Sequence, residues 1–148
     1  MVLARSSNVV NIDEVPLVFS ISNAVQQALH DNYGVESTVV CNGIVTSRFV
    51  SRPKTMPGRQ LRIVMVSRLE HDKKGQDLLI RAVAALQGTV TVDFIGIGSS
   101  MEYLKQLTAE LHAETYVRFL GKQTQGYVAT HLADYDLFVQ PSVGKVSV

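Results

Sequence analysis

Short apolar runs alternate with segments of helical periodicity along this chain of 148 residues. After residue 60 the apolar runs are rich in β-branched side chains and bounded by glycine or polar residues, which predicts buried strands joined by crossover helices. The strands are predicted at Leu61–Val66, Val90–Ile95, Tyr116–Leu120 and Asp136–Val139. The pattern therefore predicts an α/β fold with a Rossmann-like parallel sheet. Right-handed crossovers in such a half-fold place the first and fourth strands side by side.

The segments between these strands have the periodicity of amphipathic helices. The first begins after Gly75 and is predicted to end at Gly88, since glycine commonly follows the last turn of a helix. Its predicted apolar face consists of Leu78, Leu79, Ala82, Val83 and Leu86. Ser99 and Glu102 have the spacing of a capping box, which predicts the start of the second helix. A short third helix is predicted over Gln125–Ala133.

The first 41 residues have the same alternating pattern on a smaller scale. Strands are predicted at Leu17–Ile21 and Glu36–Cys41, with a helix between them that Ser22 caps and Gly34 ends in a left-handed conformation. Residues 42–60 then hold prolines, glycines and basic residues with little periodicity, which is typical of a linker. The predicted organisation is thus the end of one domain at 1–41, a linker at 42–60 and part of a second domain at 61–148.

The composition is typical of a folded globular protein. Hydrophobic residues make up 46% and charged residues 18%, and the net charge of +1 gives no reason to expect nucleic acid or a membrane as the main partner. No apolar run approaches the about 18 residues that span a bilayer, and the first residues do not resemble a signal peptide. The single cysteine, Cys41, lies in an apolar run and is expected to be a buried thiol. These features predict a cytoplasmic protein.

A basic loop, Ser67–Gly75, follows the first strand of the second part and carries Arg68 and Lys74. Ligands of open α/β sheets bind at the carboxyl ends of strands, where helix N-termini favour anions. Arginine suits bidentate contact with phosphate, and lysine adds a compact positive charge. The loop therefore predicts a phosphate-bearing ligand at Arg68 and Lys74, with the intervening Glu70, His71 and Asp72 at the loop surface.

A second candidate is the turn Gly96-Ile97-Gly98, which follows one strand and opens a helix. Glycines there allow the backbone to approach a ligand, although a tight structural turn explains them equally well. The turn lacks the full G-x-G-x-x-G pattern and no acid ends the next strand, so a nicotinamide cofactor is disfavoured. No cluster has the spacing of a metal site, and no phosphate loop or nucleophile elbow is present. The sequence predicts a binding crevice without an evident acid, base or nucleophile.

Taken together in order, five stretches resemble the retaining glycosyltransferases of family 4, which have the GT-B fold. Their patterns are V-S-x-x-V/L, N-G-V-D-x-x-x-F, V-G-R-L-x-x-x-K-G, I-x-G-x-G, and V-x-F-L-G with D-x-F-V-x-P-S. The matching stretches are Ser20–Val25, Asn42–Phe49, Ile63–Gly75, Phe94–Gly98, and Val117–Gly121 with Asp136–Ser142. The resemblance covers most of residues 18–142 and implies part of a GT-B C-terminal domain preceded by the end of the N-terminal domain.

The resemblance implies transfer of a sugar from a nucleotide-diphosphate sugar to an acceptor hydroxyl, with no metal and no other cofactor. Arg68 and Lys74 would neutralise the donor diphosphate as it leaves. Weaker donor contacts are implied for Asn42 and Gly43 at the interdomain cleft, Lys122 and Gln123 near the nucleobase, and Gly96, Gly98 and Ser142. The acceptor, a glycan or a lipid-linked sugar, would bind the rest of the N-terminal domain, and peripheral membrane association of a parent enzyme is left open.

The sequence also departs from the family. Val45 stands where the family usually has aspartate, Ser67 replaces a glycine, and the E-x₇-E stretch that follows "P-S" in the family is absent after Ser142. We therefore expect a fragment of a hexosyltransferase-like enzyme of polysaccharide biosynthesis, with no catalytic residue of its own and little or no activity. Alternatives are a nucleotide-sugar epimerase of the same architecture, a non-catalytic doubly wound signalling domain, and a folding remnant with an exposed sheet edge.

Overall fold

The computed structural model describes residues 2–5, 8–11, 17–53 and 60–143, and divides into two compact units, Met1–Val45 and Thr46–Val148. The division falls after Val45, within the segment predicted as a linker. The assignment of 1–41, 42–60 and 61–148 to parts of two larger domains stays a prediction.

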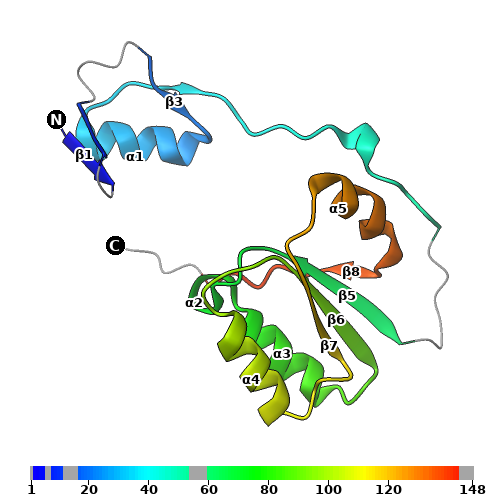
Figure 1. Ribbon diagram of the computed structural model, residues 1–148. Coiled ribbons are helices and arrows are strands. Elements are labelled where there is room, and N and C mark those ends of the chain that lie inside the picture. The colour runs from blue at the N-terminus through cyan, green and yellow to red at the C-terminus, as the bar shows by residue number, and fades with distance from the viewer. Residues whose placement is uncertain (1, 6–7, 12–16, 54–59, 144–148) are drawn as a thin grey trace. The chain divides into compact units, whose positions relative to one another are not determined.

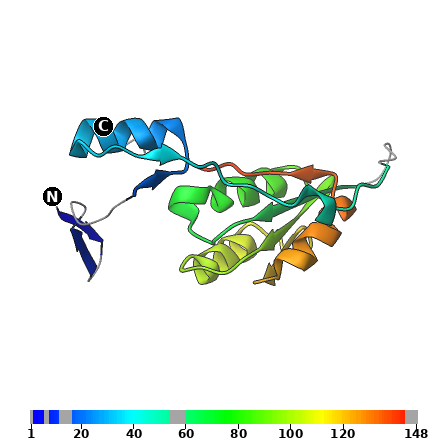
Figure 2. The ribbon, with the colours of Figure 1, turned by 90° about the horizontal axis from the view of Figure 1, so that it is seen from above.

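The first unit contains a hairpin, a two-stranded parallel pair and one helix. Its elements are β1 (Val2–Arg5), β2 (Asn8–Asn11), β3 (Phe19–Ser20), α1 (Asn23–Tyr33) and β4 (Thr38–Val39). β1 pairs with β2 in antiparallel fashion, and β3 pairs with β4 in parallel, with α1 against that pair (Figure 2). Both predicted caps of α1 are confirmed. The Ser22 hydroxyl accepts a hydrogen bond from the Val25 N–H at 3.3 Å, and Gly34, at a φ of +62°, donates to the His30 carbonyl at 2.8 Å.

The expectation of a buried thiol at Cys41 is wrong, because Cys41 is exposed. The strand predicted over Glu36–Cys41 pairs only at β4, so the chain has left the sheet before it reaches the cysteine. The apolar pattern thus marked a strand correctly and overstated both its length and its burial.

The second unit is built on a four-stranded parallel sheet. The strands are β5 (Leu61–Val66), β6 (Val90–Ile95), β7 (Val117–Gly121) and β8 (Leu137–Phe138), in the order β7-β6-β5-β8. Ile63 of β5 lies opposite Val92 of β6 and opposite Leu137 of β8. The predicted fold class is confirmed, as is the prediction that the first and fourth of these strands are neighbours (Figure 1).

Helices cover both faces of this sheet. They are α2 (His71–Lys74), α3 (Gln76–Ala85), α4 (Met101–Glu110) and α5 (Gln125–His131), with 3₁₀ turns η2 (Thr46–Arg48) and η3 (Leu132–Asp134). Side chains alternate between the faces of a strand. Met65 and Phe94 therefore pack with α3 and α4 in the main core, whereas Val64 and Ile95 pack with α5 and Tyr135 on the other face. No helix among the described residues is long and apolar enough to cross a membrane.

Two local predictions in this unit are wrong. The buried stripe of α3 is Gln76, Leu79, Ile80 and Val83, whereas Leu78 and Leu86 are about half exposed. The stripe is set by the start of the helix directly after Gly75, so that positions 1, 4, 5 and 8 of the helix face the sheet. The capping box is also absent, because α4 begins after Ser100 and the Ser100 hydroxyl makes no cap hydrogen bond.

Candidate functional site

The basic loop lies where the sequence places it, at the carboxyl end of β5. The strand ends at Val66. From His71 to Lys74 the chain forms the single helical turn α2, where the sequence predicted an irregular surface loop. Gly75, at a φ of +70°, ends α2 and directly precedes α3, and its N–H donates to the His71 carbonyl at 2.8 Å. Arg68 is thus fixed next to a strand end, and Lys74 next to the first turn of a ten-residue helix.

The glycine turn after β6 packs directly on this loop. A Cβ atom at Gly96 would lie 1.9 Å from the Ser67 carbonyl oxygen, and one at Gly98 would lie 2.2 Å from that of Leu69. The Leu69 N–H donates to the Ile97 carbonyl at 3.1 Å, so the two loops meet backbone to backbone. This close packing requires glycine at both positions even if no ligand binds there. The contacts with a donor that the family resemblance implies for Gly96 and Gly98 stay a prediction.

The loop after β8 reaches the same place. A Cβ atom at Gly75 would lie 2.4 Å from the Pro141 carbonyl oxygen, and the Val143 N–H donates to the Lys73 carbonyl at 3.0 Å. The expected neighbourhood of the basic loop and the Gln140-Pro141-Ser142 loop is therefore confirmed. Ser142 itself is exposed and accepts a hydrogen bond from the Gln140 side chain at 3.2 Å.

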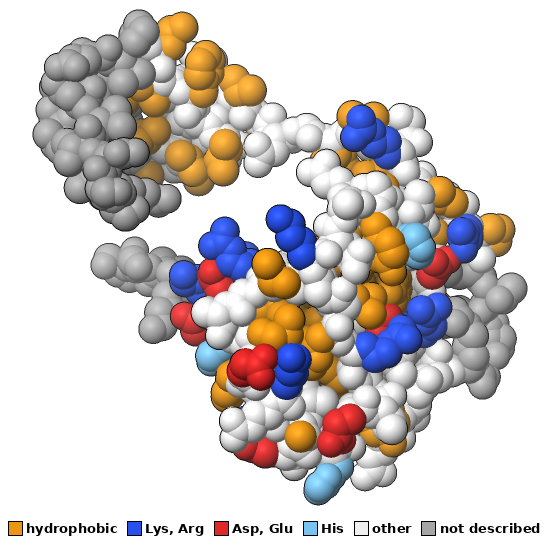
Figure 3. Space-filling view, in the orientation of Figure 1, with side chains coloured by type: hydrophobic (Ala, Val, Ile, Leu, Met, Phe, Trp, Pro, Cys, Tyr) orange, Lys and Arg blue, Asp and Glu red, His pale blue; other side chains and the backbone are white. Residues whose placement is uncertain are grey.

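The two predicted diphosphate ligands differ in their surroundings. The Arg68 side chain is 73% exposed, and its guanidinium donates to Glu70 at 3.1 Å. The Lys74 side chain is partly buried, and no described residue pairs with its ammonium. Basic and acidic side chains lie next to each other around α2 (Figure 3). The structure thus places two cations at one edge of the sheet: an exposed guanidinium bound to Glu70, and an ammonium without a partner among the described residues.

Glu70 belongs to this cluster, although the sequence suggested only a surface residue. Its side chain is 21% exposed, and its second carboxylate oxygen lies 3.5 Å from the Lys73 ammonium. The hydrogen bond from Arg68 lowers the pKa of the Glu70 carboxyl, and the charge of Lys73 acts in the same direction. The carboxylate therefore partly neutralises the loop in the absence of a ligand.

The residue that sequence reasoning missed is Gln76, the first residue of α3. It is fully buried, and its side-chain amide donates to the Ser67 hydroxyl at 3.1 Å and to the Arg68 carbonyl at 2.8 Å. Its Oε1 has no hydrogen-bond partner among the described residues. Gln76 therefore holds the backbone from which Arg68 projects. The sequence feature that could have identified Gln76 is its position, since it is a polar residue at the start of an otherwise apolar helical stripe.

A second contact fixes α2 against α4. The Ser100 hydroxyl lies 2.8 Å from His71 Nδ1 and accepts from the His71 N–H at 3.1 Å, and the His71 ring packs on Tyr103 with centroids 4.3 Å apart. His71 is thus part of the scaffold. Within the described ranges no three His, Cys, Asp or Glu side chains are arranged to hold a metal ion.

The remaining predicted site residues lie in two places. Lys122 and Gln123 follow β7 at the same edge of the sheet, where the Gly96 N–H donates to the Gly121 carbonyl at 2.8 Å. Lys122 is exposed, and the Gln123 amide donates to the Leu120 carbonyl at 2.8 Å. Asn42 and Gly43 belong to the first unit and are exposed there, so their predicted contact with a donor stays a prediction.

Comparison with known proteins identifies the family. Residues 47–144 match the model of the family described as "Glycosyl transferases group 1". The chain is 34% identical over 104 residues to WcaL of Escherichia coli strain K12, a protein assigned to colanic acid biosynthesis as a glycosyltransferase. That alignment covers 68% of this chain and 25% of WcaL.

Solved structures agree with this match. Anabaena HepE, in complex with UDP and glucose, superposes with a TM-score of 0.68 at 27% identity, over 85% of this chain and 38% of HepE. A glycosyltransferase from Rickettsia africae gives a TM-score of 0.69 at 20% identity, over 86% of this chain and 38% of that protein. This chain therefore spans between a quarter and two fifths of the length of these relatives. Because the family model matches most of the chain, and the fold matches as well, the chain belongs to the group 1 glycosyl transferases.

Proposed function

We propose that this chain carries the donor diphosphate site of a glycosyltransferase. The enzyme would transfer a sugar from a nucleotide-diphosphate sugar to an acceptor hydroxyl, with retention of configuration and without a metal. The observation that carries the proposal is the placement of Arg68 and Lys74 on one loop at the carboxyl end of β5, with the loops after β6 and β8 packed against it.

The chemistry of the reaction explains why such a loop is needed. As the bond between sugar and diphosphate breaks, negative charge builds up on the leaving β-phosphate. Fixed positive groups next to that phosphate stabilise the transition state more than the ground state, which accelerates the reaction. Arg68 can contact two phosphate oxygens at once, and Lys74 can supply a second charge. Gln76 would hold the Arg68 backbone in place during this step.

The relatives support a particular donor class. HepE has been solved with UDP-glucose, and it is 27% identical to this chain over the aligned residues. We therefore infer a uridine diphosphate sugar as the first donor to test. The likeness to WcaL supports an acceptor of the kind found in bacterial polysaccharide assembly. A cytoplasmic site of action stays a prediction from the sequence. Because the relatives are much longer, we expect this chain to bind the nucleotide and to transfer little or no sugar by itself.

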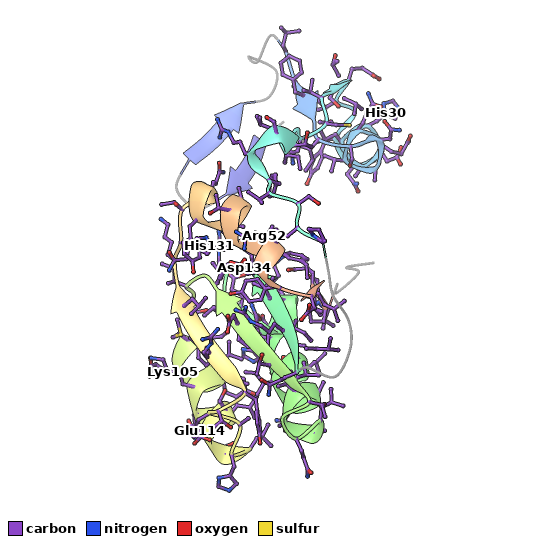
Figure 4. The ribbon with its side chains drawn as sticks, turned by 90° about the vertical axis from the view of Figure 1, so that its right-hand side faces the viewer. His30, Arg52, Lys105, Glu114, His131 and Asp134 are labelled. Atoms are coloured by element: carbon purple, nitrogen blue, oxygen red, sulfur yellow. The ribbon has the colours of Figure 1, made fainter. Side chains whose placement is uncertain are left out.

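The proposal is tested by titrating the chain with UDP and with GDP in a calorimeter. Loss of a charge-assisted hydrogen bond costs about 1.5–3 kcal/mol, so Arg68→Ala is expected to weaken UDP binding roughly ten- to a hundredfold. Lys74→Ala should weaken it as well. Lys105→Ala is the matched control, because Lys105 on α4 is exposed, pairs with Glu102 at 3.1 Å and is not part of the loop Ser67–Gly75 (Figure 4).

Two results would contradict the proposal. One is an unchanged affinity for UDP in both Arg68→Ala and Lys74→Ala. The other is the absence of any UDP binding to the unaltered, folded chain at millimolar nucleotide. Equal weakening by Lys105→Ala would show that only the net charge matters, and would also contradict a specific site.

A further inference from the structure

Glu70 is an acid fixed between groups that are expected to bind an anion. Its carboxylate accepts from Arg68 at 3.1 Å and lies 3.5 Å from the Lys73 ammonium. Its backbone carbonyl accepts from the N–H groups of Lys73 and Lys74, at 3.0 and 2.8 Å, and so holds the first turn of α2. Glu70 is thus anchored by its own backbone as well as by its side chain.

The exposed fractions show which partner can move. The Glu70 side chain is 21% exposed, whereas those of Arg68 and Lys73 are 73% and 69% exposed. A ligand can therefore draw the arginine away from the carboxylate, but the carboxylate stays beside the ligand. Any phosphate bound to Arg68 must compete with Glu70 and then lie close to its negative charge.

This charge acts differently on the substrate and on the product of the proposed reaction. In a nucleotide sugar the β-phosphate is esterified to the sugar. After transfer, the released nucleoside diphosphate has an additional ionised oxygen, and so one more negative charge. Repulsion from a nearby carboxylate grows with the charge of the ligand. A fixed acid beside the β-phosphate therefore opposes the product more strongly than the donor.

We propose that Glu70 selects the nucleotide sugar over the nucleoside diphosphate at this site, and so promotes release of the product. The inference rests on the proposed function, since it requires the diphosphate to bind at Arg68. Product release limits the rate of many enzymes, so weaker product binding would be of direct use. In this role Glu70 sets specificity through charge and need not take part in bond breaking.

The size of the effect follows from Coulomb's law. We take a separation of roughly 8 Å between the Glu70 carboxylate and the β-phosphate, and an effective dielectric constant of about 60, under which one additional negative charge on the ligand changes its affinity about threefold. Glu70→Gln is therefore expected to tighten the binding of both ligands, and to tighten UDP about three times more than UDP-glucose. Added salt should reduce this difference, because it screens exposed charges.

The experiment titrates UDP and UDP-glucose into the unaltered chain and into Glu70→Gln, Arg68→Ala and Glu102→Gln, with circular dichroism to establish folding. Glu102→Gln is the matched control. It removes the carboxylate of an exposed pair with Lys105 at 3.1 Å, and it should leave the ratio of the two affinities unchanged. If Glu70→Gln does not fold, Glu70→Ser removes the same charge and retains a side chain that is favoured at a helix N-cap.

The outcomes separate the two hypotheses. A selective gain for UDP in the Glu70 variant supports the inference. An equal change for both ligands, or none, overturns it, while a loss of UDP binding in Arg68→Ala still supports the proposed function. Unchanged UDP binding in Arg68→Ala overturns this inference, and unchanged binding in both Arg68→Ala and Lys74→Ala overturns the proposed function with it.

Discussion

The buried carboxylate of Asp93 offers a direct test of what holds the second unit together. Asp93 lies on β6 with its side chain 3% exposed. Arg118 on β7 donates to its two oxygens at 2.7 and 2.6 Å, and the Tyr135 hydroxyl donates at 2.7 Å. The guanidinium of Arg62 lies over the Tyr135 ring, 4.9 Å from its centroid. One acid thus joins two strands to the segment that leads into β8.

The two halves of this ion pair should differ in their effect on stability. Arg118→Met leaves a buried carboxylate with Tyr135 as its donor, and breaking a buried pair in this way costs about 3–5 kcal/mol. The Arg118 side chain is 59% exposed, so part of its interaction is already weakened by water and we expect about 2–3 kcal/mol. Asp93→Asn leaves an acceptor for Tyr135 and lets the guanidinium turn into solvent. Its expected cost is about 1–2 kcal/mol.

Urea unfolding followed by circular dichroism measures both values, since the sequence contains no tryptophan to serve as a fluorescent probe. Each 1 kcal/mol corresponds to a shift in melting temperature of roughly 4–8 °C for a unit of this size. Arg52→Met is the control, because Arg52 pairs with Asp134 at the surface, with side chains 55% and 27% exposed (Figure 4). That pair should contribute less than about 1 kcal/mol. If Arg118→Met costs no more than Arg52→Met, the argument from the buried carboxylate is refuted.

Two further predictions concern the site and the dependence of stability on pH. Gly96→Ala should displace the basic loop, because the new Cβ atom would lie 1.9 Å from the Ser67 carbonyl oxygen, and we expect loss of UDP binding and of stability. Gly126→Ala in α5 is the control. Its Cβ atom would lie 3.9 Å from the nearest atom, so this change should be neutral or slightly stabilising. Burial and the bond to Asp93 raise the pKa of the Tyr135 hydroxyl above its ordinary value of 10. The fold therefore favours the neutral phenol, and its contribution is present below pH 10 and is lost as the pH rises through the folded-state pKa. Urea titrations on either side of pH 10 should show a smaller alkaline loss in Tyr135→Phe, and an equal loss in both proteins would contradict this assignment.

Local sequence was sufficient for the features that depend on neighbouring residues. Runs such as Leu61–Val66 identify strands by their β-branched apolar content, and Ser22 and Gly34 mark the ends of α1 through interactions within one turn. The placement of Arg68 at a strand end follows from the same pattern. The pairing of β5 with β8 was also predictable, because the handedness of crossover connections restricts the possible strand orders.

Only the tertiary structure decided features that join distant parts of the chain. The Asp93 cluster unites residues from β6, β7 and the segment before β8, and no local pattern connects them. The buried amide of Gln76 and the glycines that admit the neighbouring loop depend in the same way on what lies opposite them. Hydrophobic periodicity and backbone preference act over a few residues, whereas packing and hydrogen bonding depend on which segments the fold brings together. The sequence by itself thus determined the four strands of the parallel sheet, the family resemblance and the position of the basic loop, and the fold decided how Gln76 and the loops after β6 and β8 hold that loop.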